Sequence, residues 1–336
     1  MNNPPLVSIG LLSYNRPLSL KKALGSLVSQ SYKNIEIIIG DNSENNEAEK
    51  IYKKYIKDKR IKYYRHIKNI GMWANYRFVL GLAEGKYFMW SSDDDYWDNT
   101  FIEKAVQKLE QSPKAVACWP SITFFDENGG ILLKPNFDNQ DVSNDTIIKR
   151  LIRVNLKDTW LEFHCLMKTG IAKEFNFDNY QLIGTDVVFI NHLLLSGKCL
   201  MINEPLFNYH LAATQAYERH DYKSTIYNEY ARINPIFDLF IKCFQLILRS
   251  EKINNFQKIF FFIRYWFNLI FINQNYIYQC CKFPMIKFFN LAIKKRDYNI
   301  IFICFPLLPL LLPFKLAFFF YDKFKYRKLK SISKGK

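Results

Sequence analysis

The first hundred residues alternate between short apolar runs and segments with helical spacing. The apolar runs cover residues 6–12, 35–39, 61–65 and 87–90. In the first intervening segment, Leu20, Ala23, Leu24 and Leu27 recur at the three- and four-residue spacing of a helix with one buried face. This repeated order of strand and helix predicts an α/β fold, with a parallel sheet and helices on both faces. Two later apolar runs are predicted as further strands, at 115–119 and 122–125.

Polar side chains follow three of these runs directly. The clusters are Ser13-Tyr14-Asn15, Asp41-Asn42-Ser43 and Asp93-Asp94-Asp95. In open α/β sheets, ligands bind beyond the carboxyl ends of the strands. We therefore expect the fold to bring the three clusters into one cleft, where the chemistry of the protein takes place.

The acidic cluster is the most informative of the three. Asp93, Asp94 and Asp95 repel one another, so they add nothing to stability at the end of a strand. A hard divalent cation, Mg²⁺ or Mn²⁺, reverses this, because it takes carboxylate oxygens as ligands and bridges to substrate phosphates. The alternative from the sequence alone is a solvated acidic turn before the helix that starts near Thr100.

Two common phosphate-binding loops do not occur in the sequence. No Gly-x-Gly-x-x-Gly follows the first apolar run, and there is no Gly-x-x-x-x-Gly-Lys. This argues against a dinucleotide-dependent dehydrogenase and against a P-loop NTPase. A disordered chain is also excluded, because 49% of the residues are hydrophobic and 17% are aromatic.

The positive charge is concentrated toward the C-terminus. The formal net charge is +16. Residues 1–234 contain 29 Lys and Arg against 27 Asp and Glu, a net of +2, whereas residues 235–336 contain 18 against 4, a net of +14. We therefore expect a near-neutral domain over 1–234 and a separate basic, aromatic region over 235–336.

The basic region also carries long apolar runs. Residues 256–272 are mostly Phe, Ile, Tyr and Trp, and residues 300–314 are apolar throughout but include three prolines. A spanning helix needs about 20 apolar residues, and prolines break a straight helix. We expect a helical region whose segment 300–321 re-enters or lies on a membrane, with anionic lipids as its partner. A buried helical core with a solvated basic end is the alternative. Nucleic-acid binding is not expected, because the basic residues flank apolar runs.

The cysteines and the start of the sequence bear on location. Seven cysteines occur, without a Cys-x-x-Cys pair or the Cys/His spacing of a zinc site. Their odd number, and a start without the basic and apolar segments of a signal peptide, indicate reduced thiols in the cytosol.

Several motifs follow one another in a fixed order along the first third of the chain. They are VSIGLLSYNRP at 7–17, SLVSQSY at 26–32, IEIIIGDNS at 35–43, NIG at 69–71, AEGKY at 83–87 and SDDDYW at 92–97. Together they resemble the family 2 glycosyltransferases, closely over residues 5–125 and weakly over 126–215.

The resemblance implies a GT-A fold, which is Rossmann-like, and sugar transfer from a nucleotide-sugar donor with a divalent metal. Tyr14 falls where the family places a residue against the nucleobase. Asp41 matches the family aspartate that hydrogen-bonds the base, often uracil. Asp93 and Asp94 match the Asp-x-Asp region, which implies Asp94 as the main metal ligand and Mn²⁺ or Mg²⁺ as the cofactor.

The resemblance also assigns three asparagines to the nucleotide-sugar. Asn15 lies in the motif at 7–17 and Asn69 in the motif at 69–71. Asn75 and Arg77, which follow the second of them, are implied contacts of the ribose or the phosphates.

The sequence departs from the family pattern at two positions. Gly40 stands where many members have an aspartate, and Ser92 stands where many have the first acid of the metal motif. The second departure leaves open whether Asp95 also coordinates the metal, directly or through water.

Inverting transfer requires a base that takes the proton of the acceptor hydroxyl. The resemblance implies Asp186, in the sequence IGTDV, as this base. The alternative is that Asp186 or Thr185 simply caps the following helix.

The resemblance also implies His210 as a contact of the metal or diphosphate, and His164 as part of the acceptor side, although a lone histidine is more often structural.

These features predict an inverting, metal-dependent glycosyltransferase at the cytoplasmic face of a bacterial inner membrane. It would move a sugar from a nucleotide-sugar to a lipid-linked or polysaccharide acceptor in capsule, O-antigen or exopolysaccharide synthesis. A UDP-sugar is the expected donor. Residues 1–234 would be the catalytic domain, with a nucleotide-binding half at about 1–100 and an acceptor half at about 101–234, and residues 235–336 would associate with the membrane. The alternatives are a sugar nucleotidyltransferase, which usually has a Gly-rich basic loop after the first strand, and an inactive membrane-bound assembly partner.

Overall fold

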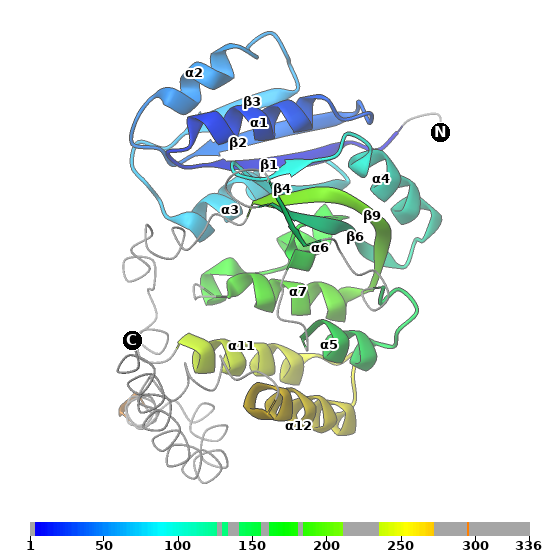
Figure 1. The fold of residues 1–336 in the computed structure, drawn as a ribbon. Helices are drawn as coiled ribbons and strands as arrows, with labels where there is room; N and C mark the ends of the chain where they lie inside the picture. The colour runs from blue at the N-terminus through cyan, green and yellow to red at the C-terminus, as the bar shows by residue number, and fades with distance from the viewer. Residues whose placement is uncertain are drawn as a thin grey trace, which may run out of the picture.

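The computed structural model describes residues 4–125, 130–133, 141–155, 161–180, 184–210, 235–271 and 294–295. In this part of the chain, helices cover both faces of a central mixed sheet (Figure 1). The strands are β1 Val7–Ser13, β2 Ile35–Asp41, β3 Ile61–Arg65, β4 Tyr87–Ser92, β5 Tyr96–Trp97, β6 Ala115–Phe125, β7 Ile131–Leu133, β8 Leu166–Lys168 and β9 Lys198–His210. The α-helices are α1 Pro17–Val28, α2 Glu47–Lys53, α3 Met72–Gly81, α4 Phe101–Gln111, α5 Ile147–Asn155, α6 Thr169–Lys173, α7 Thr185–Ser196, α11 Pro235–Arg249 and α12 Asn255–Phe271. Two short 3-10 helices cover Leu161–Phe163 and Phe177–Tyr180.

The sheet has a parallel half and a mixed half. Its strand order is β3-β2-β1-β4-β8-β6-β9-β5, with β7 on β6. Strands β1 to β4 run parallel, as the alternation of strand and helix predicts. In the other half β8 is antiparallel to both β4 and β6, while β6 and β9 run parallel. The carboxyl ends of β1, β2 and β4 therefore lie at one edge of the sheet.

Each face of the sheet has its own apolar core. Helix α1 begins at Pro17, whose missing N–H costs nothing in a first turn, and buries its Leu and Ala side chains with those of α4 on one face. On the other face α3 and α7 pack around Trp90, Phe163 and Phe189. Strands β1 and β2 are buried on both faces, which explains why most of their residues are apolar.

The two runs predicted as separate strands at 115–119 and 122–125 form the single strand β6. Its pairing with β9 shifts register on both sides of Ser121, next to Pro120. A proline gives no N–H to the ladder, so the strand bends there without ending. The sequence shows the proline but not the β9 partner that keeps the strand continuous.

Helices α11 and α12 follow the predicted boundary at residue 234. Helix α11 packs on α7, and Leu239, Ile241 and Cys243 join the same core as α7 (Figure 1). The described start of the basic region is thus attached to the sheet domain through an apolar contact. In the part of the chain that the structure describes, no helix combines the length and apolar character needed to cross a membrane. The segment 300–321, expected to re-enter or lie on a membrane, falls outside the described residues.

The departure of Gly40 from the family pattern has a steric explanation. A Cβ atom at Gly40 would lie 2.3 Å from the Oδ1 atom of Asn75 and 2.8 Å from Val79 on α3. The Nδ2 group of Asn75 donates to the Gly40 carbonyl at 2.8 Å, and its Oδ1 atom lies 3.0 Å from His66 Nε2. The amide of Asn75 therefore fills the space that a side chain at position 40 would need.

We predict that Gly40→Ala lowers the free energy of unfolding by about 1–3 kcal/mol, because overpacking a buried site forces its neighbours apart. Combining it with Asn75→Ala removes the clashing amide, so the double variant should lose less than the sum of the two single variants. Urea unfolding measures both. The control is Gly25→Ala in α1, where a Cβ meets nothing within 4 Å and alanine is the better helix former. A Gly40→Ala variant as stable as the Gly25→Ala variant would contradict the packing described here.

Candidate functional site

The three polar clusters at the ends of β1, β2 and β4 are joined by hydrogen bonds. The backbone N–H of Tyr14 donates to the Asp93 carboxylate at 2.7 Å, which links the ends of β1 and β4. The backbone N–H of Asn15 donates to the Ser43 hydroxyl at 2.9 Å, which links the ends of β1 and β2. The structure thus brings the three clusters together at one end of the sheet, as the sequence predicts.

Asn15 gives the loop after β1 its shape. Its φ angle is 54°, in the left-handed region, which asparagine tolerates better than most residues. Its Oδ1 atom accepts from the backbone N–H of Glu44 at 3.2 Å and from the side chain of Asn45 at 3.4 Å. The residue predicted to bind the nucleotide-sugar therefore also fixes the turn between the clusters.

The acidic motif consists of two buried carboxylates around a partly exposed one. Asp93 and Asp95 are 4% and 3% exposed, and Asp94 lies between them. Burial, followed by the charge of Asp94, raises the pKa of Asp93 to about 7, although the Tyr14 N–H and Arg16 oppose this. Burial and the same neighbour raise the pKa of Asp95 well above its usual value. The motif is thus short of positive charge.

Arg16 supplies part of that charge. Its Nη1 atom donates to Asp94 and lies 3.3 Å from the Asp93 carboxylate. Arg16 has no predicted role, although it directly follows Tyr14 and Asn15. Arg16 is the first basic residue after β1, the strand whose end meets the ends of β2 and β4. That position could have identified it, because buried carboxylates require a positive partner.

A pocket of about 200 Å³ opens beside the acidic motif. It is lined by Leu18, Ser19, Lys22, Asp94, Asp95, Tyr96 and His210. The pocket therefore brings Asp94 and Asp95 together with His210, which the sequence analysis placed at the metal or diphosphate. The backbone N–H of His210 also donates to the Asp95 carboxylate at 3.1 Å.

The donor atoms of this pocket suit a hard cation. Among the described residues, no group of three His, Cys, Asp or Glu side chains converges on a point. Mg²⁺ needs no such cage, because it commonly binds through one or two carboxylates and completes its shell with substrate phosphates and water. Asp94 and Asp95 provide that number of carboxylates at one pocket wall, so the residues present fit Mg²⁺ or Mn²⁺.

Asp41 lies at the end of β2 and is fully buried. The Tyr63 hydroxyl donates to its Oδ2 atom at 2.6 Å, and the Ser43 N–H donates to its Oδ1 atom at 2.8 Å. Burial, together with this bond to Asp41, raises the pKa of Tyr63. Each carboxylate oxygen of Asp41 thus accepts a bond within the protein, and because the side chain is fully buried its predicted contact with a base requires a local movement.

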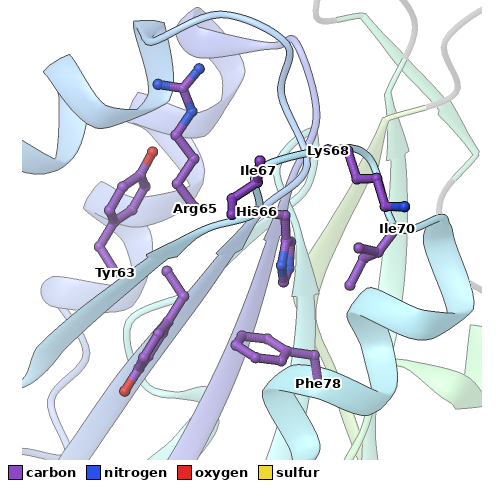
Figure 2. Close-up of a pocket in the computed structure, with 8 residues that line it drawn as sticks. Tyr63, Arg65, His66, Ile67, Lys68, Ile70 and Phe78 are labelled. Carbon is purple, nitrogen blue, oxygen red and sulfur yellow. The ribbon is translucent and has the colours of Figure 1, made fainter.

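The loop after β3 lies next to this end of the sheet. Its residue Asn69 accepts a bond from the Gly71 N–H at 2.8 Å, and Asn42 bonds to Ile70 and Gly71 at 3.2 Å. A pocket of about 590 Å³ opens beside the loop (Figure 2), lined by Tyr63, Tyr64, Arg65, His66, Ile67, Lys68, Ile70 and Phe78. The structure places the predicted residue Asn69 in the loop that borders this pocket.

Asp186 lies in the first turn of α7, after Gly184, whose φ is 86°. The helix has no side-chain cap bond from residue 184. Burial raises the pKa of Asp186 to about 6, and backbone N–H groups of its own turn partly oppose this. Gly184 is at the N-cap, so neither Asp186 nor Thr185 caps the helix as in the alternative, and the role of Asp186 as the base stays a prediction.

Tyr76 connects Asp186 electrostatically with the acidic motif. Burial raises the pKa of its hydroxyl, a bond with Ser92 opposes this, and the charges of Asp94 and Asp186 raise it further. The charges of both carboxylates thus act on the Tyr76 hydroxyl.

Three other predicted contacts lie elsewhere. Asn75 is 2% exposed and bonded to Gly40 and His66, as described above. Arg77 pairs with the exposed Asp178. His164 is buried against Phe207, with ring centroids 4.5 Å apart, and burial lowers its pKa to about 4. The structure therefore gives these side chains packing or pairing partners outside the acidic pocket.

Comparison with known proteins identifies one family and several relatives. The family model "Glycosyl transferase family 2" matches residues 8–176. An uncharacterized glycosyltransferase of Methanocaldococcus jannaschii is 29% identical over 230 residues, which cover 67% of this chain and 78% of the relative. The Escherichia coli protein WfaP, a "UDP-Glc:alpha-D-GlcNAc-diphosphoundecaprenol beta-1,3-glucosyltransferase", is 36% identical over 105 residues, 31% of this chain and 41% of WfaP.

A solved structure shares the fold of the described part of the chain. The structure of S. aureus TarS 1–349 in complex with UDP-GlcNAc superimposes with a TM-score of 0.65, covering 96% of this chain and 91% of TarS. The sequence identity is 15%, so the likeness is one of fold.

We predict that Arg16→Ala destabilises the protein by about 1–3 kcal/mol, because it leaves two carboxylates without their cation. Arg16→Lys keeps the charge and should lose clearly less. Added Mg²⁺ should restore the lost stability of Arg16→Ala more than it stabilises the wild type, because the metal then replaces the missing charge. Thermal unfolding with and without Mg²⁺ measures this. An equal shift by Mg²⁺ in all three proteins would show that Arg16 does not compensate the metal-binding carboxylates.

Proposed function

The chain belongs to glycosyltransferase family 2, and from this premise we propose that it transfers a sugar from a UDP-sugar to a lipid-linked saccharide with the aid of a divalent cation. It is a glycosyltransferase with a GT-A fold. The observation that carries the proposal is the joining of the β1 loop, through the Tyr14 N–H, to the buried carboxylate of Asp93. This bond joins the segment that the family pattern assigns to the base with the segment that it assigns to the metal.

The relatives support the chemical class of donor and acceptor. The printed name of WfaP gives a UDP-glucose donor and a diphosphoundecaprenol-linked acceptor, and TarS has been solved with UDP-GlcNAc. A UDP-sugar and a lipid-linked saccharide are therefore the substrates we propose. Synthesis of a capsule, O-antigen or exopolysaccharide is the corresponding pathway class.

The acidic pocket would hold the cation and the leaving diphosphate. Asp94 and Asp95 are the residues that would bind Mg²⁺ or Mn²⁺, with His210 beside them. A bound divalent cation supplies charge stabilisation to the diphosphate as it leaves. Arg16, which pairs with Asp94, would add a second positive charge beside the phosphates.

Asp186 would act as the base in this scheme. A general base works best with a pKa near the working pH, and burial brings that of Asp186 to about 6. Its carboxylate takes the proton of the acceptor hydroxyl while the oxygen attacks the anomeric carbon.

The division of the chain and its location complete the proposal. Residues 1–234 would form the catalytic domain, and residues 235–336, with their net charge of +14, would associate with the membrane surface. The cytoplasmic face of a bacterial inner membrane offers both the nucleotide-sugar and the lipid-linked acceptor. The family assignment favours this function over a sugar nucleotidyltransferase.

A panel of nucleotide-sugars tests the donor and the metal together. We expect one UDP-sugar to raise the unfolding temperature of the wild type only when Mn²⁺ or Mg²⁺ is present, and to support transfer to a polyprenyl-diphosphate saccharide, detected by mass spectrometry. Asp94→Asn should abolish transfer while leaving the fold intact, whereas Asp58→Asn, which removes a surface ion pair with Arg60, should be active. Transfer by Asp94→Asn at the wild-type rate would exclude the proposed metal ligand. A wild type that binds no donor would indicate the inactive assembly partner.

The pH dependence of transfer tests Asp186. The base must be deprotonated, so the rate constant should fall about tenfold per pH unit below a pKa near 6. Asp186→Asn should lose transfer, and it should gain stability relative to the wild type above pH 6, since it removes the cost of a buried charge. This gain should shrink as the pH falls through 6, where the wild-type carboxyl becomes neutral. Retained transfer by Asp186→Asn would exclude the residue as the base.

A further inference from the structure

Helix α12 presents a stripe of large apolar side chains to solvent. Phe256, Ile259, Phe260 and Ile263 are 77%, 58%, 50% and 60% exposed. Their spacing of three, four and seven residues places them on one face of the helix. We call these four residues the α12 stripe. Isolated exposed apolar residues are common, but a contiguous row of this kind marks an interaction surface.

The α12 stripe is not needed to hold the helix in place. The opposite face of α12 buries Phe261, which is 1% exposed, and packs Phe262 on Phe244 of α11, with ring centroids 4.4 Å apart. Helix α12 lies on the outside of the α5 and α11 layer, away from the sheet (Figure 1). The stripe therefore projects from a helix that its other side already anchors.

Positive charge flanks the α12 stripe along the chain. Arg249 and Lys252 precede the helix and are exposed, and Arg264 is exposed at the end of the stripe. The ammonium groups of Lys252 and Lys258 donate to the Ser196 and Leu248 carbonyls at 3.1 and 2.9 Å. Between residues 249 and 264, Glu251 is the one acidic residue in the sequence, against four basic residues. An apolar row within a basic border complements a surface that is apolar inside and anionic outside.

The charge also discriminates between possible occupants. Residues 272–336, which follow α12, contain 13 Lys and Arg against two Asp. That segment and a second copy of this basic region both carry the same sign of charge as the border of the stripe. An anionic bilayer carries the opposite sign and accepts apolar side chains beneath its headgroups.

We propose that the α12 stripe is a membrane-docking face, which inserts between the headgroups of a bilayer rich in anionic lipid. Phe256, Ile259, Phe260 and Ile263 enter the boundary between headgroups and acyl chains, and the basic residues bind the lipid phosphates. The inference rests on the proposed function in one respect: docking through α12 brings the catalytic domain to acceptors that are anchored in the same bilayer.

Vesicle sedimentation of the full-length chain tests this docking face. We expect binding to vesicles of equal parts phosphatidylglycerol and phosphatidylethanolamine, weak binding to phosphatidylcholine vesicles, and loss of binding as salt rises. Ile259→Ser/Ile263→Ser should weaken binding roughly tenfold or more, because each isoleucine contributes a large part of its burial free energy. The matched control is Ile56→Ser/Ile131→Ser, which removes two isoleucines of similar exposure, 62% and 55%, from other surfaces, and it should bind as the wild type does.

Three results would overturn the proposal. Equal vesicle binding by Ile259→Ser/Ile263→Ser and the wild type would show that the stripe does not insert. A wild-type dimer that this variant splits, with vesicle binding unchanged, would identify the stripe as a contact between copies. A lower unfolding temperature of the variant, again with unchanged vesicle binding, would indicate that the chain covers the stripe itself.

The same variant separates this inference from the proposed function. On a water-soluble acceptor analogue, Ile259→Ser/Ile263→Ser should transfer sugar at the wild-type rate, whereas on an acceptor embedded in anionic vesicles it should be slower by about the factor lost in binding. Absence of transfer in every protein would refute the proposed function but leave the vesicle result standing. Equal transfer by the variant and the wild type on embedded acceptor would refute the docking face alone.

Discussion

The hydrogen bond from the Tyr14 N–H to the Asp93 carboxylate is the contact on which the site depends. It joins the ends of β1 and β4 across a buried acid that burial alone would protonate. A buried carboxylate keeps its charge only with bonds or cations at hand, and the β1 loop provides both, through Tyr14 and through Arg16. The position of the loop and the charge of the acidic motif therefore determine each other.

The same coupling extends to the β2 side of the site. Asn15, held in a left-handed conformation, bonds to Ser43 and to the loop after β2. Asp41, one residue before Asn42, is fixed by the Tyr63 hydroxyl. These contacts restrict the movement of the loops after β1 and β2. A ligand that displaces one of the bonded groups must replace the hydrogen bonds that this group loses. Such preorganisation is what a site for a large, charged donor requires.

The sequence predicts the convergence of the three clusters because it follows from a topological rule: parallel strands end at the same edge. It does not predict Arg16 as the partner of Asp93 and Asp94, because that choice depends on the left-handed turn at Asn15. Likewise, nothing local at Gly40 reveals that Asn75, on α3, occupies its side-chain space. The spacing of apolar and polar residues predicts the helices and strands. Contacts between distant segments depend on three-dimensional packing, which a single sequence does not reveal.

The bond between the His210 N–H and Asp95 extends this reasoning to the acceptor half. His210 is the last residue of β9, so the acidic motif is tied to the end of this strand. The bond uses the Oδ1 atom of Asp95, and the second carboxylate oxygen can still bind another partner. Asp95 can therefore hold the end of β9 and line the acidic pocket at the same time. This contact connects the acidic pocket directly with the part of the chain that we predict to bind the acceptor.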